Sequence, residues 1–494
     1  MNTVAELIQN IEIIETINFN NINVTGITYN SLDVKQDNIF CALRGTATDG
    51  NIFIPQAIEK GARVIVTETH PAQASNNVTY IIVEDARETM ALLAKNFFEF
   101  KKNKAKIIGV TGTNGKTTIT FLISWLLKKI GFSTAIIGTT GIYLQDEKIP
   151  ATHTTPESVK LYEIISKINS LGINYIIMEV SSHSLVQKRV YGIEFKTAIF
   201  TNLTPDHLDY HKTMQNYADA KKILFDSLHP SSFAVINSDD NFSEYVTKSL
   251  NSNQIIKVGE NTSSDFVIKS KKSGINGISF DLFCKKTNKI IHFDSNLIGE
   301  FNISNLGMAL VTVSNLGIDL ESLTKYTSDI TAAPGRMELI KLETGSIGVV
   351  DYAHTPDSLE KAIKTLRNII KDGKLITVFG CGGDRDKSKR PTMGRIASTL
   401  SDKVIITNDN PRSENPDDII QEIIQGIDRS FFHKIDIIPD RSSAIKSAVS
   451  NSQPGDIVLI AGKGHENYQI FGDVKIHFDD LEELRKYESK KQNG

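Results

Sequence analysis

Short apolar runs alternate with amphipathic stretches along most of this chain. The apolar runs predict strands at residues 39–43, 64–66, 106–110, 134–137, 175–178, 197–200, 346–350, 374–379, 403–406 and 456–460. Helical spacing of apolar residues predicts helices at 55–60, 87–100 and 119–130. This alternation of strand, loop and helix predicts an α/β fold in which helices cover parallel sheets. Residues 265–293 alternate polar and apolar positions instead, which predicts an antiparallel extension.

Two interruptions divide this pattern into three blocks. The polar run at residues 101–104 follows the first block, and the pair Pro334-Gly335 opens the third. A chain of 494 residues is too long for one core, because a typical domain has ~100–200 residues. We therefore expect three domains, at residues 1–102, 103–333 and 334–494.

Composition and charge exclude several classes of function. The chain has 55 Lys and Arg against 58 Asp and Glu, and a net charge of −3 would attract neither nucleic acid nor a membrane surface. Cys41, Cys284 and Cys381 are scattered, so neither a disulfide framework nor a thiolate zinc site is expected. The N-terminal residues lack the pattern of a secretory signal, and no run approaches the ~20 apolar residues of a membrane span. We expect a cytoplasmic monomer that acts on small molecules, without nucleic acid and without membrane insertion.

The strand at 106–110 is followed by a glycine-rich loop and a helix. This arrangement directs backbone N–H groups and a helix N-terminus at one point, where they bind phosphate. Lys116 would reach the terminal phosphates of ATP, and the Thr117 hydroxyl would help to hold Mg²⁺. Val110 stands where the strict P-loop pattern has glycine, which indicates a variant loop. The predicted nucleotide-binding loop consists of Gly112, Thr113, Asn114, Gly115, Lys116, Thr117 and Thr118.

Further motifs occur in a fixed order after this loop. They read MEVSSHSL (178–185), NLTPDHLDYH (202–211), YADAK (217–221), GEFNISN (299–305), GRME (335–338) and DYAHTPDSL (351–359). Together with TGTNGKTT, they resemble the ATP-dependent Mur ligases, which add amino acids to UDP-N-acetylmuramic acid. The resemblance implies an N-terminal domain that binds the nucleotide sugar, a central P-loop ATPase domain with a parallel sheet, and a C-terminal Rossmann-like domain.

Three later motifs resemble the family members that add meso-diaminopimelate to UDP-MurNAc-L-Ala-D-Glu. They are GCGGDRDKSKRP (380–391), DNPR (409–412) and AGKGHE (461–466). Lysine-adding relatives typically lack the arginine of DNPR, and only diaminopimelate carries a second carboxylate for a planar arginine to bind. Arg412 and Arg385 are therefore the expected carboxylate ligands. The resemblance completes this amino-acid site with Asp409, Asn410, Pro411, Gly462 and Glu466.

Lys116, Glu179, His207 and Lys221 are the expected catalytic residues. The family phosphorylates a carboxylate with ATP and Mg²⁺, and the incoming amine displaces phosphate from the acyl phosphate. The resemblance implies that Mg²⁺ is held by Thr117, Glu179, His207 and a carbamylated Lys221. Lys222 leaves the position of that lysine open by one place, although the YADAK register favours Lys221. A zinc pair of His207 and His211 is not expected, because Leu208 occupies the glutamate position of HExxH.

The remaining site residues also come from the resemblance. Asn305, Arg336 and Asp351 are expected to contact adenine, phosphate and ribose respectively. The expected contacts to the sugar-peptide substrate are Ser31, Thr154, Thr155, Ser181, Gln187 and Arg189. Around Ser31 the chain reads Asn30-Ser31-Leu32 where the family commonly has Asp-Ser-Arg, and His153 stands where asparagine is frequent.

Several alternatives remain beside the diaminopimelate-adding ligase. A lysine-adding Mur ligase would lack Arg412, and a folylpolyglutamate synthetase would not carry both SSHSLVQ and DNPR. A P-loop regulatory ATPase would hydrolyse ATP without needing an amino acid. A catalytically silent module would not need Lys116, Glu179, His207 and Lys221. NAD binding at Gly380 to Gly383 is discounted, because Arg385 occupies the sixth position of the dinucleotide motif.

Overall fold

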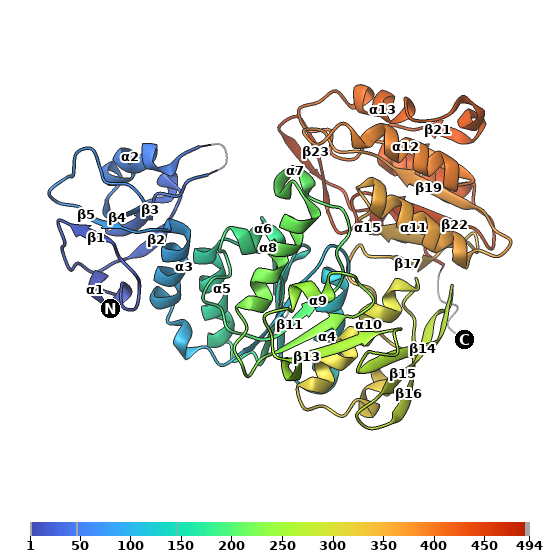
Figure 1. Ribbon diagram of the computed structural model, residues 1–494. Coiled ribbons are helices and arrows are strands. Elements are labelled where there is room, and N and C mark those ends of the chain that lie inside the picture. Colours follow the sequence, from blue (N-terminus) through green and yellow to red (C-terminus); the bar gives the residue numbers. More distant parts are fainter. Residues whose placement is uncertain (1, 46–47, 146, 490–494) are drawn as a thin grey trace. The chain divides into compact units, whose positions relative to one another are not determined.

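A computed structural model describes residues 2–45, 48–145 and 147–489 of the chain (Figure 1). The chain forms two compact units, Met1–Ser264 and Asp265–Gly494, and each is described by itself. The outer ends of the first and third expected domains fall on residues outside the described ranges. The domain boundaries at 102/103 and 333/334 stay a prediction.

The first unit begins with a five-stranded sheet in the order β1-β5-β4-β3-β2. Its strands are β1 (Glu15–Ile17), β2 (Gly26–Thr28), β3 (Asn38–Cys41), β4 (Ala62–Thr67) and β5 (Thr79–Ile82). Only β1 runs antiparallel to its neighbour. Helices α1 (Val4–Leu7), α2 (Ile54–Glu59) and α3 (Ala86–Phe97) accompany this sheet.

A larger sheet fills the rest of the first unit, in the order β13-β12-β11-β6-β10-β7-β8-β9. Its strands are β6 (Lys106–Thr111), β7 (Thr134–Gly138), β8 (Gly141–Leu144), β9 (Glu147–Ile149), β10 (Tyr175–Glu179), β11 (Phe195–Phe200), β12 (Phe233–Asn237) and β13 (Ile255–Gly259). The strands from β13 to β7 are parallel, and β8 and β9 are antiparallel. Its helices are α4 (Lys116–Lys129), α5 (Ser158–Ser170), α6 (Ser182–Val186), α7 (Leu208–His211), α8 (Met214–Asp226) and α9 (Ser243–Val246).

The central strands of this sheet explain why the site forms where it does. Every residue of β10 is buried, as is every residue of β6 after Lys106, because helices cover both faces. In a parallel sheet the carboxyl ends of neighbouring strands lie at one edge, which is where ligands bind. The loop after β6 and the carboxylate at the end of β10 therefore share one edge, since β6 pairs with β10.

The second unit contains a three-stranded antiparallel meander and a six-stranded sheet. The meander consists of β14 (Phe266–Gly274), β15 (Gly277–Cys284) and β16 (Lys289–Ser295), and α10 (Phe301–Asn315) packs against it. The sheet has the order β17-β18-β22-β19-β20-β21, with only β17 antiparallel. Its strands are β17 (Glu338–Lys341), β18 (Ile347–Asp351), β19 (Leu375–Phe379), β20 (Lys403–Ile406), β21 (Ile435–Ile437) and β22 (Ile457–Ala461).

Helices lie on both faces of this second sheet, as in a Rossmann-like domain (Figure 1). Two apolar clusters form, one on each face. The helices are α11 (Pro356–Ile369), α12 (Lys389–Leu400), α13 (Pro416–Ile424), α14 (Arg441–Ser450) and α15 (Asp480–Arg485). A small hairpin of β23 (Tyr468–Phe471) and β24 (Val474–His477) follows β22.

The expected α/β class is confirmed, as are the ten expected strands and the antiparallel extension after residue 265. The sequence pattern missed mainly short or edge strands, such as β1, β8, β9 and β21. Strands of three or four residues are too short for alternation to be visible, and their pairing depends on distant neighbours.

Candidate functional site

The loop between β6 and α4 is built for close approach of an anion. Gly112 and Gly115 have φ angles of 145° and 86°, which favour glycine. A Cβ on Gly112 would lie 1.8 Å from the Thr201 hydroxyl oxygen, so no side chain fits there. Gly115 directly precedes the first residue of α4 and gives that helix no side-chain cap, so the N-terminus of the helix faces the loop. These features fit the phosphates of a nucleotide.

Two lysine amines meet at the Gly112 carbonyl. Lys116 Nζ donates to the carbonyls of Gly112 and Thr113 at 2.9 and 2.8 Å, which holds it across the loop. Lys221 Nζ, from α8, donates to the same Gly112 carbonyl at 2.9 Å. The two expected catalytic lysines are therefore close together, although 105 positions separate them in the sequence.

Burial distinguishes Lys221 from its neighbour Lys222. Lys221 is only 1% exposed, and its amine lies 4.4 Å from the centre of the Tyr217 ring. Burial, with a smaller contribution from Lys116, lowers the pKa of Lys221 well below its ordinary value. Lys222 instead points to the surface and pairs with Asp226 at 2.5 Å. Lys221 is thus the lysine that faces the loop, as the YADAK register favours.

Glu179, the last residue of β10, is held by three donors. Thr117 Oγ1 and the Thr139 N–H donate to Oε1 at 3.0 and 2.9 Å, and Thr139 Oγ1 donates to Oε2 at 3.1 Å. Glu179 is 1% exposed, so its carboxylate is shielded from solvent. A Cβ on Gly138 would lie 2.3 Å from Oε1, which fixes the carboxylate against the backbone. Sequence reasoning missed Thr139, the first of two threonines just after β7.

A carboxylate beside a threonine hydroxyl fits a hard cation such as Mg²⁺. Within the described ranges, no three His, Cys, Asp or Glu side chains are grouped to hold a metal by themselves. Magnesium sites commonly use one or two carboxylates together with phosphate oxygens of the substrate. Glu179 and Thr117 supply the protein's share of such a set.

His207 lies in a cluster of aromatic side chains. Its ring centre is 4.9 Å from that of His183, which in turn is 5.4 Å from His211. His211 is buried, shares a hydrogen bond of 2.9 Å with the Ser182 hydroxyl and stacks on Tyr217. Burial, followed by the charge of His183, lowers the pKa of His211 to about 4. His211 is therefore a neutral packing residue, whereas His207 is half exposed and available to a ligand.

The expected sugar-peptide contacts at residues 154–189 form one network. The Thr155 hydroxyl is fully buried and donates to the Glu179 carbonyl at 2.8 Å, while Thr154 and Thr139 share a hydroxyl contact of 3.1 Å. Arg189 lies 2.8 Å from Glu157 and donates to the Thr155 carbonyl and the Gln187 side chain. This network orders the loop before α6, and Ser181 caps that helix. Direct contact of these side chains with substrate stays a prediction.

The unusual residues around Ser31 keep the local backbone turn. Asn30 Oδ1 accepts a hydrogen bond from the Leu32 N–H at 3.1 Å. Asparagine and aspartate can both cap a helical turn in this way, so the change from the usual aspartate keeps the turn. Ser31 is buried and donates to Gln56 Oε1 at 2.7 Å, whereas Leu32 is 65% exposed. An exposed apolar side chain cannot pair with phosphate, so Leu32 does not replace the charge of the usual arginine.

In the second unit, the three expected nucleotide contacts are ordered by local hydrogen bonds. Asn305 on α10 donates to Asn302 Oδ1 at 3.0 Å. Asp351 ends β18 and accepts from the Met337 N–H at 2.9 Å, and burial raises its pKa. The Arg336 guanidinium lies over the Tyr352 ring at 4.8 Å. Their roles toward adenine, ribose and phosphate stay predictions.

The motif DNPR lies after β20 and forms a site together with the residues that follow β22. Asn410 Nδ2 donates to Glu466 Oε2 at 2.8 Å. Gly462 has a φ of 118°, and a Cβ there would lie 2.7 Å from Asp409 Oδ2. Arg412 has a φ of 55°, and its Nη1 donates to the Gly383 carbonyl at 2.7 Å. Arg385 is exposed and donates to its neighbour's carbonyl at 3.2 Å. Pro411 is buried between these residues.

Tyr468 on β23 borders this site, with its ring centre 5.3 Å from Lys463 Nζ. Burial and the charge of Glu466 raise the pKa of Tyr468, Asp409 adds to the rise, and Arg412 and Arg385 oppose it. Two carboxylates and two guanidinium groups therefore act on one phenol. Sequence reasoning missed Tyr468, because a tyrosine two residues after the motif AGKGHE gives no signal of its own, and the hairpin of β23 and β24 that places it is not visible in the sequence pattern.

Arg390 supports the segments that carry Arg385 and Arg412. It is fully buried on α12, donates to both carboxylate oxygens of Glu414 at 3.0 Å, and donates to the Gly382 carbonyl at 3.1 Å. Lys387 also pairs with Glu414, at 3.0 Å. These bonds lower the pKa of Glu414 to about 2, with Arg390 as the largest cause.

Replacing Arg390 with methionine should therefore lower the free energy of unfolding by about 3 kcal/mol. Lys387 remains to pair with Glu414, and Glu422, which Arg390 also contacts at 2.7 Å, is partly exposed to solvent, so the loss stays at the low end for a buried ion pair. Denaturant unfolding measures the effect. Arg395→Met, which changes an exposed arginine on the same helix, is the matched control and should change stability by less than about 0.5 kcal/mol. An equal loss in both variants would contradict the supporting role of Arg390.

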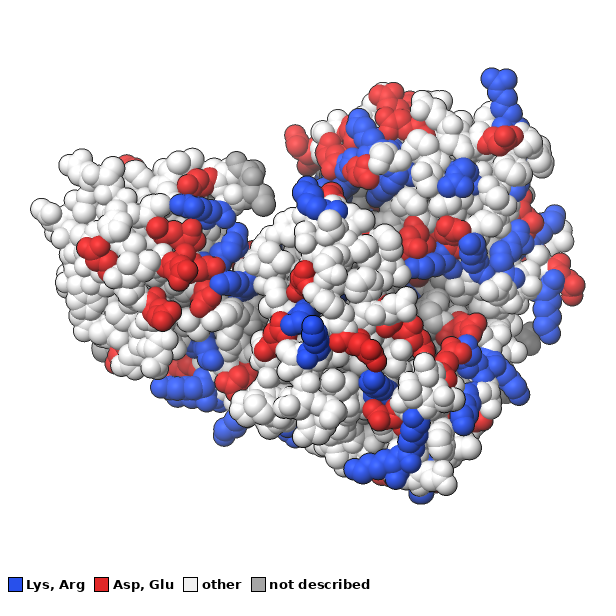
Figure 2. Space-filling view, in the orientation of Figure 1, with Lys and Arg blue, Asp and Glu red and all other residues white. Residues whose placement is uncertain are grey.

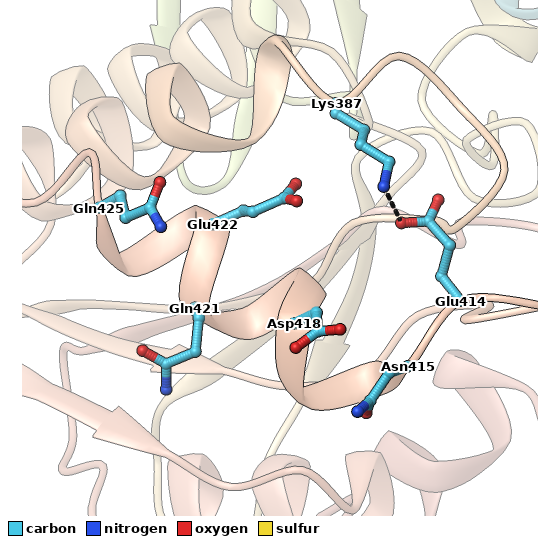
Figure 3. Close-up of a pocket in the computed structure, with 7 residues that line it drawn as sticks. All are labelled: Lys387, Glu414, Asn415, Asp418, Gln421, Glu422 and Gln425. Atoms are coloured by element: carbon cyan, nitrogen blue, oxygen red, sulfur yellow. Dashed lines mark ion pairs between the residues drawn. The ribbon is translucent and has the colours of Figure 1, made fainter.

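A surface hollow of about 410 Å³ lies beside this ion pair but is a poor candidate for the site (Figure 3). It is lined by Lys387, Glu414, Asn415, Asp418, Gln421, Glu422 and Gln425. Carboxylates and amides dominate its lining, and none of the residues expected from the sequence belongs to it. Elsewhere, positive and negative side chains are interspersed over the face shown in Figure 2, without a broad field of one sign.

Family models match most of the chain. The Mur ligase family catalytic domain matches residues 23–98, the Mur ligase middle domain matches 110–313, and the Mur ligase glutamate ligase domain matches 335–464. Among the described residues, no helix has the length and apolar character needed to cross a membrane.

Curated relatives and a solved structure match nearly the full length. A UDP-N-acetylmuramoyl-L-alanyl-D-glutamate--2,6-diaminopimelate ligase of Clostridium acetobutylicum is 44% identical over 464 residues, covering 94% of each chain. The similarly named ligase of Phocaeicola vulgatus is 40% identical, covering 97% of this chain and 98% of its own. A solved structure of a ligase of that name is 37% identical with a TM-score of 0.68, covering 94% of each chain.

Proposed function

The chain belongs to the Mur ligase family, and we propose that it joins meso-diaminopimelate to UDP-MurNAc-L-Ala-D-Glu, using ATP and Mg²⁺. The observation that carries the choice of amino acid is the geometry of the DNPR site. The Arg412 and Arg385 side chains both lie against Gly382, and the Asp409 and Glu466 carboxylates lie 3.9 and 3.4 Å from the Lys463 amine. An amino-acid head is a zwitterion, so it needs cationic and anionic partners side by side. Diaminopimelate has a second such head, and lysine has only an ammonium group at that end.

Activation of the peptide carboxylate takes place at the P-loop. A carboxylate has no good leaving group, so the terminal phosphoryl group of ATP is transferred to it, which gives an acyl phosphate and ADP. Lys116 lies across the loop, where its positive charge offsets the repulsion between the peptide carboxylate and the terminal phosphate of ATP. Bound Mg²⁺ supplies further neutralisation of the phosphate oxygens. Glu179 and Thr117 would hold the Mg²⁺ ion. The His207 side chain is half exposed and would be a further ligand.

Lys221 is proposed to act as a carbamate. Its depressed pKa favours the neutral amine, and only that form adds to CO₂, forming an N–C bond and releasing one proton. The modification replaces a neutral amine close to Lys116 with an anion, which the charge of that lysine attracts. The resulting carboxylate-like group would complete the oxygen ligands for Mg²⁺ beside Glu179.

The second step joins the activated carboxyl to the amine of diaminopimelate. The amine attacks the acyl carbon, and phosphate leaves from the tetrahedral intermediate. The second unit binds the distal head of the amino acid: Arg412 and Arg385 face its carboxylate, while Asp409 and Glu466 face its ammonium group. Arg412 is oriented by the Gly383 carbonyl, so its guanidinium is directed before the ligand arrives.

Offering both amino acids to the enzyme at once tests the proposal. The protein is incubated with ATP, Mg²⁺, UDP-MurNAc-L-Ala-D-Glu and an equimolar mixture of meso-diaminopimelate and L-lysine, and the products are identified by mass. We expect the diaminopimelate adduct to exceed the lysine adduct by at least about 100-fold, the size of one lost charge-assisted contact. A dominant lysine adduct would instead support the lysine-adding alternative.

A further inference from the structure

Lys463 lies at the base of the amino-acid site and has no assigned part in the reaction. It follows β22 within the motif AGKGHE and is completely shielded from solvent. Its Nζ lies 3.3 Å from Asn410 Oδ1 and 3.4 Å from Glu466 Oε2, with Asp409 Oδ1 at 3.9 Å. The face of Tyr468 closes another side, with the ring centre 5.3 Å away. An amine enclosed in this way is directed at the site residues rather than at a ligand.

The two carboxylates beside Lys463, those of Asp409 and Glu466, are stabilised in their ionised form by a cation between them. Asp409 and Glu466 are two carboxylates with little solvent, and like charges at short range disfavour ionisation. Burial and then Asp409 raise the pKa of Glu466, while Lys463 and the Asn410 amide oppose that rise. Lys463 is the cation that contacts both carboxylates, since Arg441 is engaged in its own buried pair with Asp480 at 2.7 Å.

We propose that Lys463 is a positioning residue for the amino-acid site, which holds Asn410 and Glu466 where they receive the distal ammonium group of the substrate. The inference rests on the proposed function, because it presumes that diaminopimelate occupies this site. Lys463 contacts three of the side chains that are expected to bind the amino acid, those of Asn410, Glu466 and Asp409. Its removal would leave the Ile470 N–H, at 3.1 Å, as the remaining donor to Asn410 Oδ1, and would leave the Asp409 and Glu466 carboxylates facing each other without a cation between them.

Lys463→Met tests this role, because methionine keeps most of the volume and removes the charge. We expect the KM for diaminopimelate to rise about 10- to 100-fold, since a hydrogen bond to a charged group is lost at the site. The KM for ATP should change less than about twofold, because the P-loop is unaffected. Lys463→Arg keeps the cation and should recover a large part of the affinity for diaminopimelate.

The pH profile separates positioning from mere packing. Glu466 faces Asp409, Lys463, Asn410, Tyr352, Tyr468 and Arg441. It must be ionised to receive an ammonium group, and losing Lys463 removes a charge that favours ionisation. The acid limb of kcat/KM for diaminopimelate should therefore move to higher pH in Lys463→Met. A packing role would leave the position of that limb unchanged.

Lys475→Met is the matched control, because Lys475 is exposed and lies over the same Tyr468 ring, at 3.9 Å. It should leave both KM values near those of the wild type. If Lys463→Met does not fold, as judged by ATP binding, Lys463→Gln replaces it with the same expectations. A wild-type KM for diaminopimelate and an unmoved acid limb in a folded charge-removing variant would overturn the inference. A wild-type enzyme that ignores diaminopimelate would instead refute the proposed function.

Discussion

Replacing Lys221 with alanine is expected to lower kcat by about 1,000-fold or more, the largest effect that the structure predicts. The side chain is buried beside the P-loop and donates to the Gly112 carbonyl, so its loss removes both a loop contact and the proposed carbamate. ATP binding should persist, because the backbone N–H groups of the loop and Lys116 remain. Steady-state assays with separate titration of each substrate measure the change.

Chemical rescue distinguishes the carbamate from a simple amine. A short carboxylic acid, such as acetate or formate, can occupy the space left by Lys221→Ala and supply a carboxylate there. We expect it to restore part of the lost rate, and raised Mg²⁺ should act in the same direction. Lys222→Ala, which changes the neighbouring surface lysine, is the matched control and should retain nearly full activity. A lack of rescue, with a strong effect of Lys222→Ala, would contradict the assignment.

Replacing Arg412 with alanine is expected to raise the KM for diaminopimelate by about 100-fold or more, while the KM for ATP changes little. The guanidinium is the group that the Gly383 carbonyl orients toward the amino-acid site. Its removal leaves a substrate carboxylate without its bidentate partner. The preference for diaminopimelate over lysine should fall by a similar factor, because lysine never used that contact.

The control for Arg412 is Arg429→Ala, which changes an exposed arginine in the same unit. It should leave both KM values unchanged. Equal increases in the KM for ATP and for diaminopimelate in Arg412→Ala would indicate a general disturbance of the fold. In that event the arginine of DNPR would not be the determinant of amino-acid choice.

Much of the fold could be predicted because buried parallel strands carry their own signal. The runs that became β6, β10 and β22 are continuous and apolar, since helices cover both faces of their sheets. The P-loop could also be located from the sequence, because its strand, its glycines and its helix follow one another directly along the chain. Short edge strands such as β9 depend on neighbours elsewhere in the chain, and their residues show no clear alternation.

The candidate site could be predicted where its residues lie within motifs, and not where it depends on distant contacts. Motif register favoured Lys221, but burial was needed to separate it from Lys222 in physical terms. Thr139 binds a carboxylate 40 positions away, so its role follows from the pairing of β7 with β10. Lys463 stood within a recognised motif, yet its contacts with Asn410 arise only when β22 and β20 lie in one sheet.

The central claim is that phosphoryl transfer at the P-loop serves amide formation with diaminopimelate. Phosphate release by the wild-type protein tests it most directly, measured with ATP, Mg²⁺ and UDP-MurNAc-L-Ala-D-Glu in the presence of meso-diaminopimelate, of L-lysine or of no amino acid. We predict rapid release that depends on diaminopimelate, with little release in the other two mixtures. Equal release without any amino acid would contradict the claim and would indicate a regulatory ATPase.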